Sequence, residues 1–302
     1  MVHIPVLLRE SIEGLALHEG ATYFDGTLGG AGHAWYAYQS VGGALTVLGC
    51  DKDEAAILRA QEQFKQAGNT PHFFHGSFEH ITSYLKDVDM DGVDAILLDL
   101  GVSSFQIDEE PRGFSFMRDE PLLMTMKASV HEDDFTARDI LNTWKEETIA
   151  DIIYAYGEER YARRIAKAIV LARAIKPFET TQDLVQVIMD AVPFVYKKGR
   201  LHPATRTFQA LRIVVNDELG SITRGLTACF EALHHGGRLA VISFHSLEDR
   251  IVKHAFKEFA EKDGNGDTHA MVITKKPIEP SEEEIRTNPR SRSAKLRILQ
   301  KK

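Results

Sequence analysis

The stretch "TYFDGTLGGAGHAWYAY", residues 22–38, combines an acid, four glycines and a histidine in one loop. Glycine tolerates positive φ and has no Cβ, so such a loop lets a ligand approach the backbone closely. A helical pattern over residues 31–38 would leave free amide groups in its first turn, and these bind acceptor atoms. The loop therefore indicates a ligand site, with a tight structural turn as the alternative. The glycines are Gly26, Gly29, Gly30 and Gly32.

The glycine spacing does not fit G-x-G-x-x-G, which disfavours a dinucleotide. Asp25 precedes the glycines, where a carboxylate repels a pyrophosphate but attracts a cationic or amine-bearing ligand. The sulfonium amino acid of S-adenosylmethionine is such a ligand. Asp51 ends the next predicted strand, where an acid accepts hydrogen bonds from a ribose diol in nucleotide-binding sheets. A solvated acid at a strand end is the alternative for Asp51.

Two more predicted strands end at the same edge, where ligands of open α/β sheets bind. Phe78 follows "HFFHGS", and a phenyl ring there could flank an adenine. Asp99 lies in "LLDLGVSS", and its carboxylate could face the methyl donor or its acceptor. The alternatives are a core aromatic for Phe78 and a turn acid for Asp99.

The histidines and cysteines do not form a metal site by their spacing. His72 and His75 lie close together, but no cysteine or second pair completes a tetrahedral set. Cys50 and Cys229 are too few for a disulfide framework and are expected to be buried thiols. We therefore expect no metal.

A histidine and a serine follow the fifth predicted strand. Ser246 and Asp249 have the spacing of an N-cap pair, so Ser246 is expected to cap the next helix. His245 could instead line the pocket of the acceptor.

Short apolar runs rich in β-forming residues alternate with longer helical patterns, which indicates a parallel sheet covered by helices. The run "VDAILLDL" is apolar on both faces, as expected for a central strand. The expected strands cover residues 23–25, 45–51, 72–75, 93–100, 238–244, 270–274 and 294–299.

Between the fourth and fifth strands the sequence gives helix signals almost exclusively. We therefore expect a sheet domain in two parts, residues 1–104 and 201–302, with an inserted helical domain at 105–200. Thr136 is expected to cap a helix, with Asp139 three residues on. One long helix is expected over residues 205–233, because Phe208, Leu211, Val215, Leu219 and Ile222 follow helical spacing.

Composition and charge limit the function classes. The chain has 302 residues, 43% of them hydrophobic and 26% charged, as in globular proteins with a sizeable core. Its apolar runs are far shorter than the roughly 20 residues that cross a bilayer, and we see no secretory signal. We therefore expect a cytoplasmic protein. The net charge of −8 disfavours a global positive field, so any nucleic-acid surface must be local.

Three basic clusters could supply such a surface. On one predicted helix face, Arg160, Arg163, Arg164 and Lys167 follow i, i+3, i+4, i+7 spacing, which suits phosphate contacts as well as a solvated charged face. The segment "YKKGRLHPATR" carries Lys197, Lys198, Arg200 and Arg206, and "NPRSRSAKLR" carries Arg290, Arg292, Lys295 and Arg297. We select Arg163, Lys167 and Arg206 as candidate RNA contacts.

Eight ordered motifs resemble the bacterial small-subunit ribosomal RNA cytosine-N4 methyltransferase family, almost from end to end. The resemblance implies an α/β fold, a class I methyltransferase with a Rossmann-like, mostly parallel sheet and a helical insertion. It also implies S-adenosylmethionine as donor and a decoding-centre cytosine as acceptor. The motifs are "HIPVLLRE", "DGTLGGAGH", "LLDLGVSS", "RGFSFMRD", "YGEERYARRIAKAIV", "HPATRTFQALRIVVNDEL", "VISFHSLEDRIVK" and "NPRSRSAKLR".

The resemblance also implies site residues and a partner. The implied partner is small-subunit ribosomal RNA within an assembled or nearly assembled subunit. No membrane partner is expected, and the question of a homodimer is left open. One segment departs from the pattern, because residues 119–127 read "DEPLLMTMK" where the family is close to "DGPLDMRMD". The family's cofactor contacts match Ala31, Gly32, His33, Asp51, Phe78, Asp99 and Gln106.

The chemistry of a cytosine amine explains what such a site must do. The N4 lone pair is delocalised into the ring, so oxygen acceptors aimed at the two N4 hydrogens favour the tetrahedral geometry needed for attack. Positive charge moves onto N4 during transfer, and fixed oxygen atoms there stabilise the transition state. Asp99 is the first candidate and Ser103 a weaker one. Once N4 is alkylated, Asp99 or water could accept its proton.

Other functions remain compatible with the sequence. An enzyme with the same sheet could methylate a small molecule or a protein side chain. Labelled methyl from the donor that appears in protein and not in RNA would favour this alternative. A module that binds small subunits without turnover is a second alternative. A nicotinamide dehydrogenase is disfavoured by the missing dinucleotide fingerprint and by Asp25.

Overall fold

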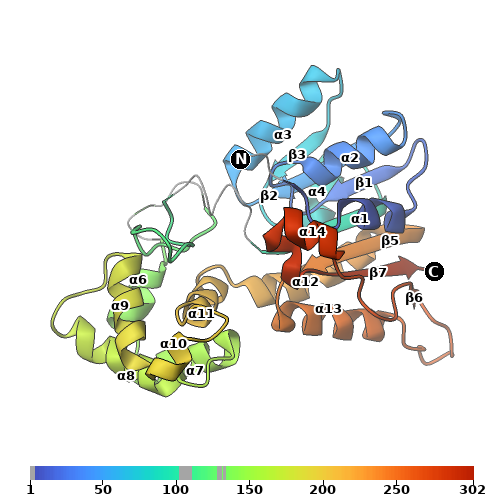
Figure 1. Cartoon of the computed structure of the whole chain (residues 1–302). Coiled ribbons are helices and arrows are strands. Elements are labelled where there is room, and N and C mark those ends of the chain that lie inside the picture. The colour runs from blue at the N-terminus through green and yellow to red at the C-terminus, as the bar shows by residue number, and fades with distance from the viewer. Residues whose placement is uncertain (1–3, 102–110, 128–130, 132–133) are drawn as a thin grey trace. The chain divides into compact units, whose positions relative to one another are not determined.

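The computed structural model describes residues 4–101, 111–127, 131 and 134–302 (Figure 1). The chain divides into two compact units. The first comprises Met1–Gly101 and Leu219–Lys302, and the second comprises Val102–Glu218. The second boundary thus lies after Glu218 and not after residue 200, as the sequence had predicted. The difference arises because a helix at Thr205–Val215 packs within the second unit.

The first unit contains a sheet in the order β3-β2-β1-β4-β5-β7-β6. Neighbouring strands are parallel except at β7, which pairs antiparallel with both β5 and β6. The expected α/β fold with a mostly parallel sheet is confirmed, and a strand lies at each expected position. The strands are β1 (Thr22–Asp25), β2 (Thr46–Asp51), β3 (His72–His75), β4 (Val93–Asp99), β5 (Leu233–Ser243), β6 (Ala270–Val272) and β7 (Lys295–Lys301).

The order of the strands reverses at β1, which lies between β2 and β4. Ligands of open α/β sheets bind outside the carboxyl ends of the strands at such a switch point. Asp25 pairs with Gly49 of β2 and Leu97 of β4, so the ends of the three strands lie side by side. The carboxyl ends of β1, β2 and β4 therefore lie together at one edge of the sheet.

Helices cover both faces of this sheet. Alternate strand residues point to opposite faces, so Tyr23 joins the core under α1, α2 and α3, and Phe24 joins the core under α4, α12 and α13. Cys50 and Cys229 are buried free thiols in the second core, as expected. The helices are α1 (Leu8–Leu15), α2 (Gly32–Ser40), α3 (Glu54–Gln66), η1 (Phe78–His80), α4 (Ile81–Asp87), α12 (Glu218–Ala232), α13 (Ser246–Phe259), α14 (Glu282–Thr287) and η2 (Pro289–Ser293).

In the part of the chain that the structure describes, the second unit has helices, one isolated β-bridge between Pro121 and Thr180, and an apolar core of its own. The predicted cap is confirmed, because Thr136 and Asp139 form a capping box at the start of α6. Among the described residues, no helix of either unit is long and apolar enough to span a membrane. The helices are α6 (Ala137–Thr143), α7 (Glu146–Gly157), α8 (Ala162–Arg173), α9 (Thr181–Ala191), α10 (Phe194–Lys197) and α11 (Thr205–Val215).

The single long helix expected over residues 205–233 is wrong. The helix ends at Val215 and α12 begins at Glu218, because Asp217 adopts a left-handed conformation with φ 46°. The side chain of Asn216 accepts a hydrogen bond from the N–H of Met126 at 2.8 Å and donates one to the carbonyl of Met124 at 2.7 Å. These contacts stabilise a break that apolar periodicity does not reveal.

Candidate active site at the carboxyl edge of the sheet

Asp25 lies beneath the glycine-rich loop and is 1% exposed. Its carboxylate accepts hydrogen bonds from the Tyr23 hydroxyl at 3.2 Å and from the Thr27 N–H at 3.1 Å. Burial raises the pKa of Asp25 to about 7, although these hydrogen bonds oppose the shift. Asp25 therefore supports the loop from below, and it is not an exposed charge that attracts a ligand.

The loop after Asp25 turns sharply into helix α2. Gly29 and Ala31 both have left-handed backbones, with φ of 48° and 56°, and Ala31 is the N-cap of α2. A Cβ on Gly26 would come within 2.3 Å of Leu98 Cδ2, so this position has no room for a side chain. Gly32 is the first residue of α2, whose first-turn amides have no acceptor within the helix. The loop thus turns tightly and leaves the first-turn amides of α2 without an acceptor in the helix, as a ligand site at this position requires.

Asp51 holds the loop from the tip of the neighbouring strand. Its Oδ2 accepts a hydrogen bond from the N–H of Gly29 at 2.8 Å, and its Oδ1 accepts one from the N–H of Asp53 at 2.9 Å. Burial raises the pKa of Asp51, and the two amides oppose that shift. A carboxylate oxygen can accept more than one hydrogen bond, so Asp51 retains the capacity to bind a diol.

Asp99 ends β4 beside the same loop. Its backbone N–H donates to Thr27 Oγ1 at 2.6 Å, and its Oδ1 is buried without a hydrogen-bond partner among the described residues. Burial raises the pKa of Asp99 well above its usual range, and the charges of Asp25 and Glu248 add to the shift. A strongly shifted acid at a ligand-binding edge is typical of a functional site.

His33 lies between the N-terminal segment and Asp99. Its Nε2 is 3.0 Å from the carbonyl of Val6, so Nε2 carries a proton, because a carbonyl only accepts. Its Nδ1 lies 3.9 Å from Asp99 Oδ2. The imidazole therefore turns Nδ1 toward the carboxylate, at a distance longer than a hydrogen bond.

Phe78, one of the predicted cofactor contacts, lies mostly inside the apolar core. Phe78 is 7% exposed and belongs to the core, where its ring packs so closely on α12 that a Cβ on Gly225 would come within 2.1 Å of Phe78 Cε2. The ring is thus largely a core aromatic. Gln106 and Ser103 lie outside the described residues.

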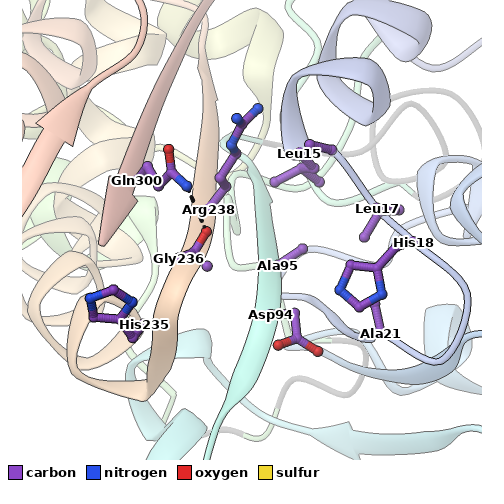
Figure 2. A pocket seen from close by; sticks show the side chains of 12 residues that line it. Leu15, Leu17, His18, Ala21, Asp94, Ala95, His235, Gly236, Arg238 and Gln300 are labelled. Atoms are coloured by element: carbon purple, nitrogen blue, oxygen red, sulfur yellow. Dashed lines mark hydrogen bonds between the residues drawn. The ribbon is translucent and has the colours of Figure 1, made fainter. Parts of the chain in front are cut away.

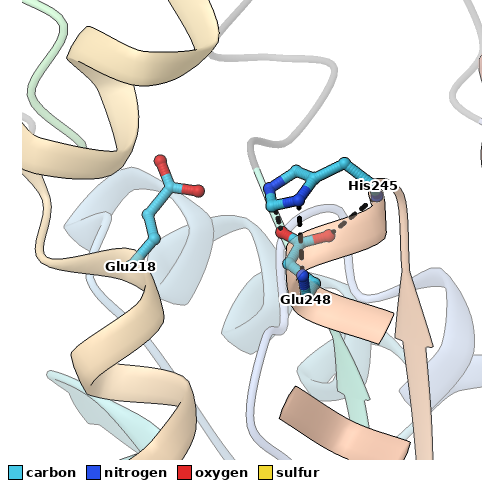
Figure 3. A group of neighbouring side chains, drawn as sticks. All are labelled: Glu218, His245 and Glu248. Carbon is cyan, nitrogen blue, oxygen red and sulfur yellow. Dashed lines mark hydrogen bonds and ion pairs between the residues drawn. The ribbon is translucent and has the colours of Figure 1, made fainter. Parts of the chain in front are cut away.

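The start of α13 differs from the sequence prediction. The N-cap residue is His245 and not Ser246, and His245 forms a capping box with Glu248 (Figure 3). His245 Nδ1 accepts a hydrogen bond from the N–H of Glu248 at 3.4 Å, and Glu248 Oε2 accepts one from the N–H of Phe244 at 2.7 Å. The imidazole takes the place of the shorter cap side chain, which leaves Ser246 as the first helical residue.

The basic residues predicted to contact RNA have different surroundings. Arg163 and Lys167 are exposed on α8. Arg206 donates to the carbonyl of Glu158 at 3.0 Å and so caps the end of α7. Arg297 is buried and donates two hydrogen bonds to Asp249, at 2.7 and 3.2 Å. The suggestion that Arg297 belongs to a phosphate-binding cluster is therefore wrong.

A cavity of about 310 Å³ lies elsewhere in the first unit (Figure 2). Asp94 and Ala95 line it at the start of β4, and Arg238 and Gln300 line it from β5 and β7. This is the edge opposite the carboxyl ends of the parallel strands, and no predicted site residue is among its lining residues. The cavity is therefore separate from the candidate active site.

Comparison with known proteins decides the family. A model of the MraW methylase family matches residues 1–302. The chain belongs to the MraW methylase family. The ribosomal RNA small subunit methyltransferase H of Clostridioides difficile is 45% identical over 99% of this chain and 98% of the relative. The protein of the same name from a Geobacter species is 46% identical over the same shares. A crystal structure of an rRNA methylase from Streptococcus thermophilus has a TM-score of 0.45 at 10% identity, over 99% of both chains.

Membership of the MraW methylase family confirms the resemblance inferred from the motifs. The segment that departs from the family pattern has a structural role in the second unit. Glu120 is buried, accepts a hydrogen bond from the N–H of Gly113 at 3.0 Å and pairs with Arg118 at 2.8 Å. Lys127 pairs with Asp134, 2.5 Å away. The substituted residues thus make ion pairs of their own.

Two residues of the candidate site were not expected from the sequence. Thr27 joins the loop to Asp99, and Glu248 adds a buried negative charge near Asp99. Thr27 gave no signal, because a threonine within a glycine-rich loop reads as a turn residue. Glu248 could have been found, because it follows His245 by three residues, which is the spacing of a capping box.

Proposed function

We propose that this protein transfers a methyl group from S-adenosylmethionine to the exocyclic N4 of a cytosine in small-subunit ribosomal RNA, at the decoding centre. The names of the curated relatives support ribosomal RNA as the substrate, and the family description supports methyl transfer. The observation that carries the proposal is the Asp99 carboxylate. It lies at the tip of β4 with a buried Oδ1 that no described residue hydrogen-bonds.

The residues at this edge fit the proposed donor. The bends at Gly29 and Ala31 bring the backbone to the ligand, with the amides of the first turn of α2 beyond them. Asp51 is the residue for the ribose diol, as in other nucleotide-binding sheets. Ala31, Gly32, His33 and Asp99 lie on the same edge, and Phe78 would contribute through its ring margin. When bound, the donor supplies an electrophilic methyl carbon on a sulfonium.

Asp99 performs the central task in this proposal. Its carboxylate accepts hydrogen bonds from the N4 amine, which frees the nitrogen lone pair from the ring for in-line attack. The carboxylate also stabilises the positive charge that develops on N4. Because burial raises its pKa, Asp99 is a suitable acceptor for the proton that N4 releases after methylation. Thr27 holds the backbone of Asp99 in place, and His33 Nδ1 lies 3.9 Å from Asp99 Oδ2.

The substrate side of the proposal includes the RNA. Arg163 and Lys167 are exposed cations on α8 that suit phosphate contacts, whereas Arg206 would act by holding the end of α7. The target base must leave its stack to reach a methyl group at the sheet edge, which costs least for an unpaired cytosine. We place the reaction in the cytoplasm, on an assembled or nearly assembled subunit.

One experiment tests the reaction directly. The full chain is incubated with isotopically labelled S-adenosylmethionine and small ribosomal subunits that lack the modification, and the nucleosides are identified by mass spectrometry after digestion. We expect label in N4-methylcytidine from small-subunit RNA. Label in another nucleoside, in protein or in nothing at all would contradict the proposal.

A further inference from the structure

The second unit brings together two basic segments that are far apart in the sequence. Residues 160–167, "RYARRIAK", contain four basic residues, and residues 194–200, "FVYKKGR", contain three, and neither contains an acid. The rings of Tyr161 and Tyr196 join them, with centroids 5.0 Å apart and planes at 74°. The two segments therefore form one surface at α8 and α10 of this unit (Figure 1).

A buried acid fixes this junction. Glu159 is fully buried, and its Oε2 accepts a short hydrogen bond from the hydroxyl of Tyr196. Its Oε1 accepts a hydrogen bond from the N–H of Tyr161 at 2.8 Å. Burial and Glu159 raise the pKa of Tyr196 to about 12, so the phenol stays neutral and keeps donating. The surface is thus held in one arrangement before any partner binds.

Flat groups and positive charges alternate on this surface. The ring of Phe194 is 68% exposed, and Lys198 Nζ lies 4.7 Å from its centroid. The guanidinium of Arg160 lies over the rings of both tyrosines, 4.8 Å from the centroid of Tyr161 and 5.1 Å from that of Tyr196. Water solvates an exposed aromatic ring poorly, so its exposure is unfavourable in the free protein. A ring beside cations suits a partner that has both π faces and negative charge.

We propose that the surface formed by Arg160, Phe194, Lys197 and Lys198 is a stacking platform for single-stranded RNA. Unpaired bases stack on aromatic rings and guanidinium planes, and the phosphates between them meet the lysines. A duplex hides its base faces and would use only the charges. The platform rests on the proposed function, because it would hold RNA that flanks the target cytosine.

Binding to a fluorescein-labelled oligouridylate, measured by fluorescence anisotropy with the full chain, tests the platform. Loss of stacking on one base should weaken the binding of Phe194→Ala by about fivefold to a hundredfold. Phe194→Tyr keeps a ring and should bind like the wild type. Leu58→Ala is the matched control, because Leu58 is 61% exposed on α3 of the other unit. Lys198→Gln should reduce the slope of log affinity against log salt by about 0.7.

The possible results separate the two proposals. Equal binding by wild type and Phe194→Ala, absence of binding by the wild type, or stronger binding to a duplex of the same length would overturn the platform. Binding that depends on Phe194 supports it even if no methyl transfer is detected, and that second result would count against the proposed reaction alone. Thermal unfolding of each variant checks that these exposed substitutions leave the fold intact.

Discussion

The hydroxyl of Thr27 accepts a hydrogen bond from the backbone N–H of Asp99 at 2.6 Å, while the N–H of Thr27 donates to Asp25. One residue of the loop after β1 therefore joins two acids that end neighbouring strands. The contact fixes the distance between the loop and the tip of β4. It explains how a loop rich in glycine holds a defined shape at the candidate site.

Thr27→Val should impair both stability and methyl transfer, because valine keeps the shape of threonine but offers no acceptor to the N–H of Asp99. Leaving that amide unsatisfied should lower the free energy of unfolding by about 1–3 kcal/mol, which urea unfolding measures. Displacement of Asp99 should lower kcat/KM by about tenfold to a hundredfold. Thr27→Ser keeps the hydroxyl and is the matched control. Full activity of the valine variant would show that the contact does not position Asp99.

Asp99→Ala should lower kcat by about a hundredfold to a thousandfold, the usual effect of removing one preorganised polar group from a transition state. Because burial raises the pKa of Asp99, the wild-type rate should rise with pH above the usual range of an aspartate, as the carboxylate form appears. Asp99→Asn keeps an oxygen acceptor and should lose this rise. Single-turnover rates over a pH series measure it, with calorimetry to report donor affinity separately. An unchanged rate in Asp99→Ala would refute the assignment.

Much of this site follows from sequence because strand ends are easy to locate. The run that ends at Asp99 is apolar on both faces, which marks a central strand, and β1 and β2 end at acids followed by turn residues. In a parallel sheet all carboxyl ends lie at one edge, so locating the strands also groups Asp25, Asp51 and Asp99. Only their environments had to come from the structure, because burial depends on the whole fold.

Other features depend on tertiary contacts that periodicity does not show. Residues 205–233 have the apolar spacing of one helix, yet the side chain of Asn216 hydrogen-bonds a distant segment and the chain breaks there. Arg297 lies in a basic motif, yet its strand is buried and its guanidinium forms an ion pair with Asp249 on α13. His245 caps a helix although histidine is a rare cap. In each case a long-range or unusual partner overrides the local pattern.

Asp249→Asn should destabilise the protein by about 3–5 kcal/mol, because it leaves the buried guanidinium of Arg297 without its countercharge. Burial disfavours the charged form of Asp249, but hydrogen bonds and the charge of Arg297 hold its pKa below its usual range. Glu261→Gln breaks an exposed pair with Lys257 and should change stability by less than about 0.5 kcal/mol. Urea unfolding of both variants makes the comparison. Similar small effects in the two would mean that the Arg297 pair is as weak as a surface pair.

Asp25→Asn should change how stability depends on pH. The folded protein holds the pKa of Asp25 at about 7, against 3.8 for the free side chain, so the folded state binds more protons between about pH 4 and 7. Stability from this group is complete below pH 4 and is lost as the pH rises through 7, by up to about 4 kcal/mol. Relative to Asp25→Asn, the wild type should therefore weaken from pH 5 to pH 8. Thr27→Ser leaves the carboxylate of Asp25 in place, so its stability should depend on pH as that of the wild type does. Parallel curves for wild type and Asp25→Asn in urea unfolding would show that Asp25 is already ionised in the folded state at low pH.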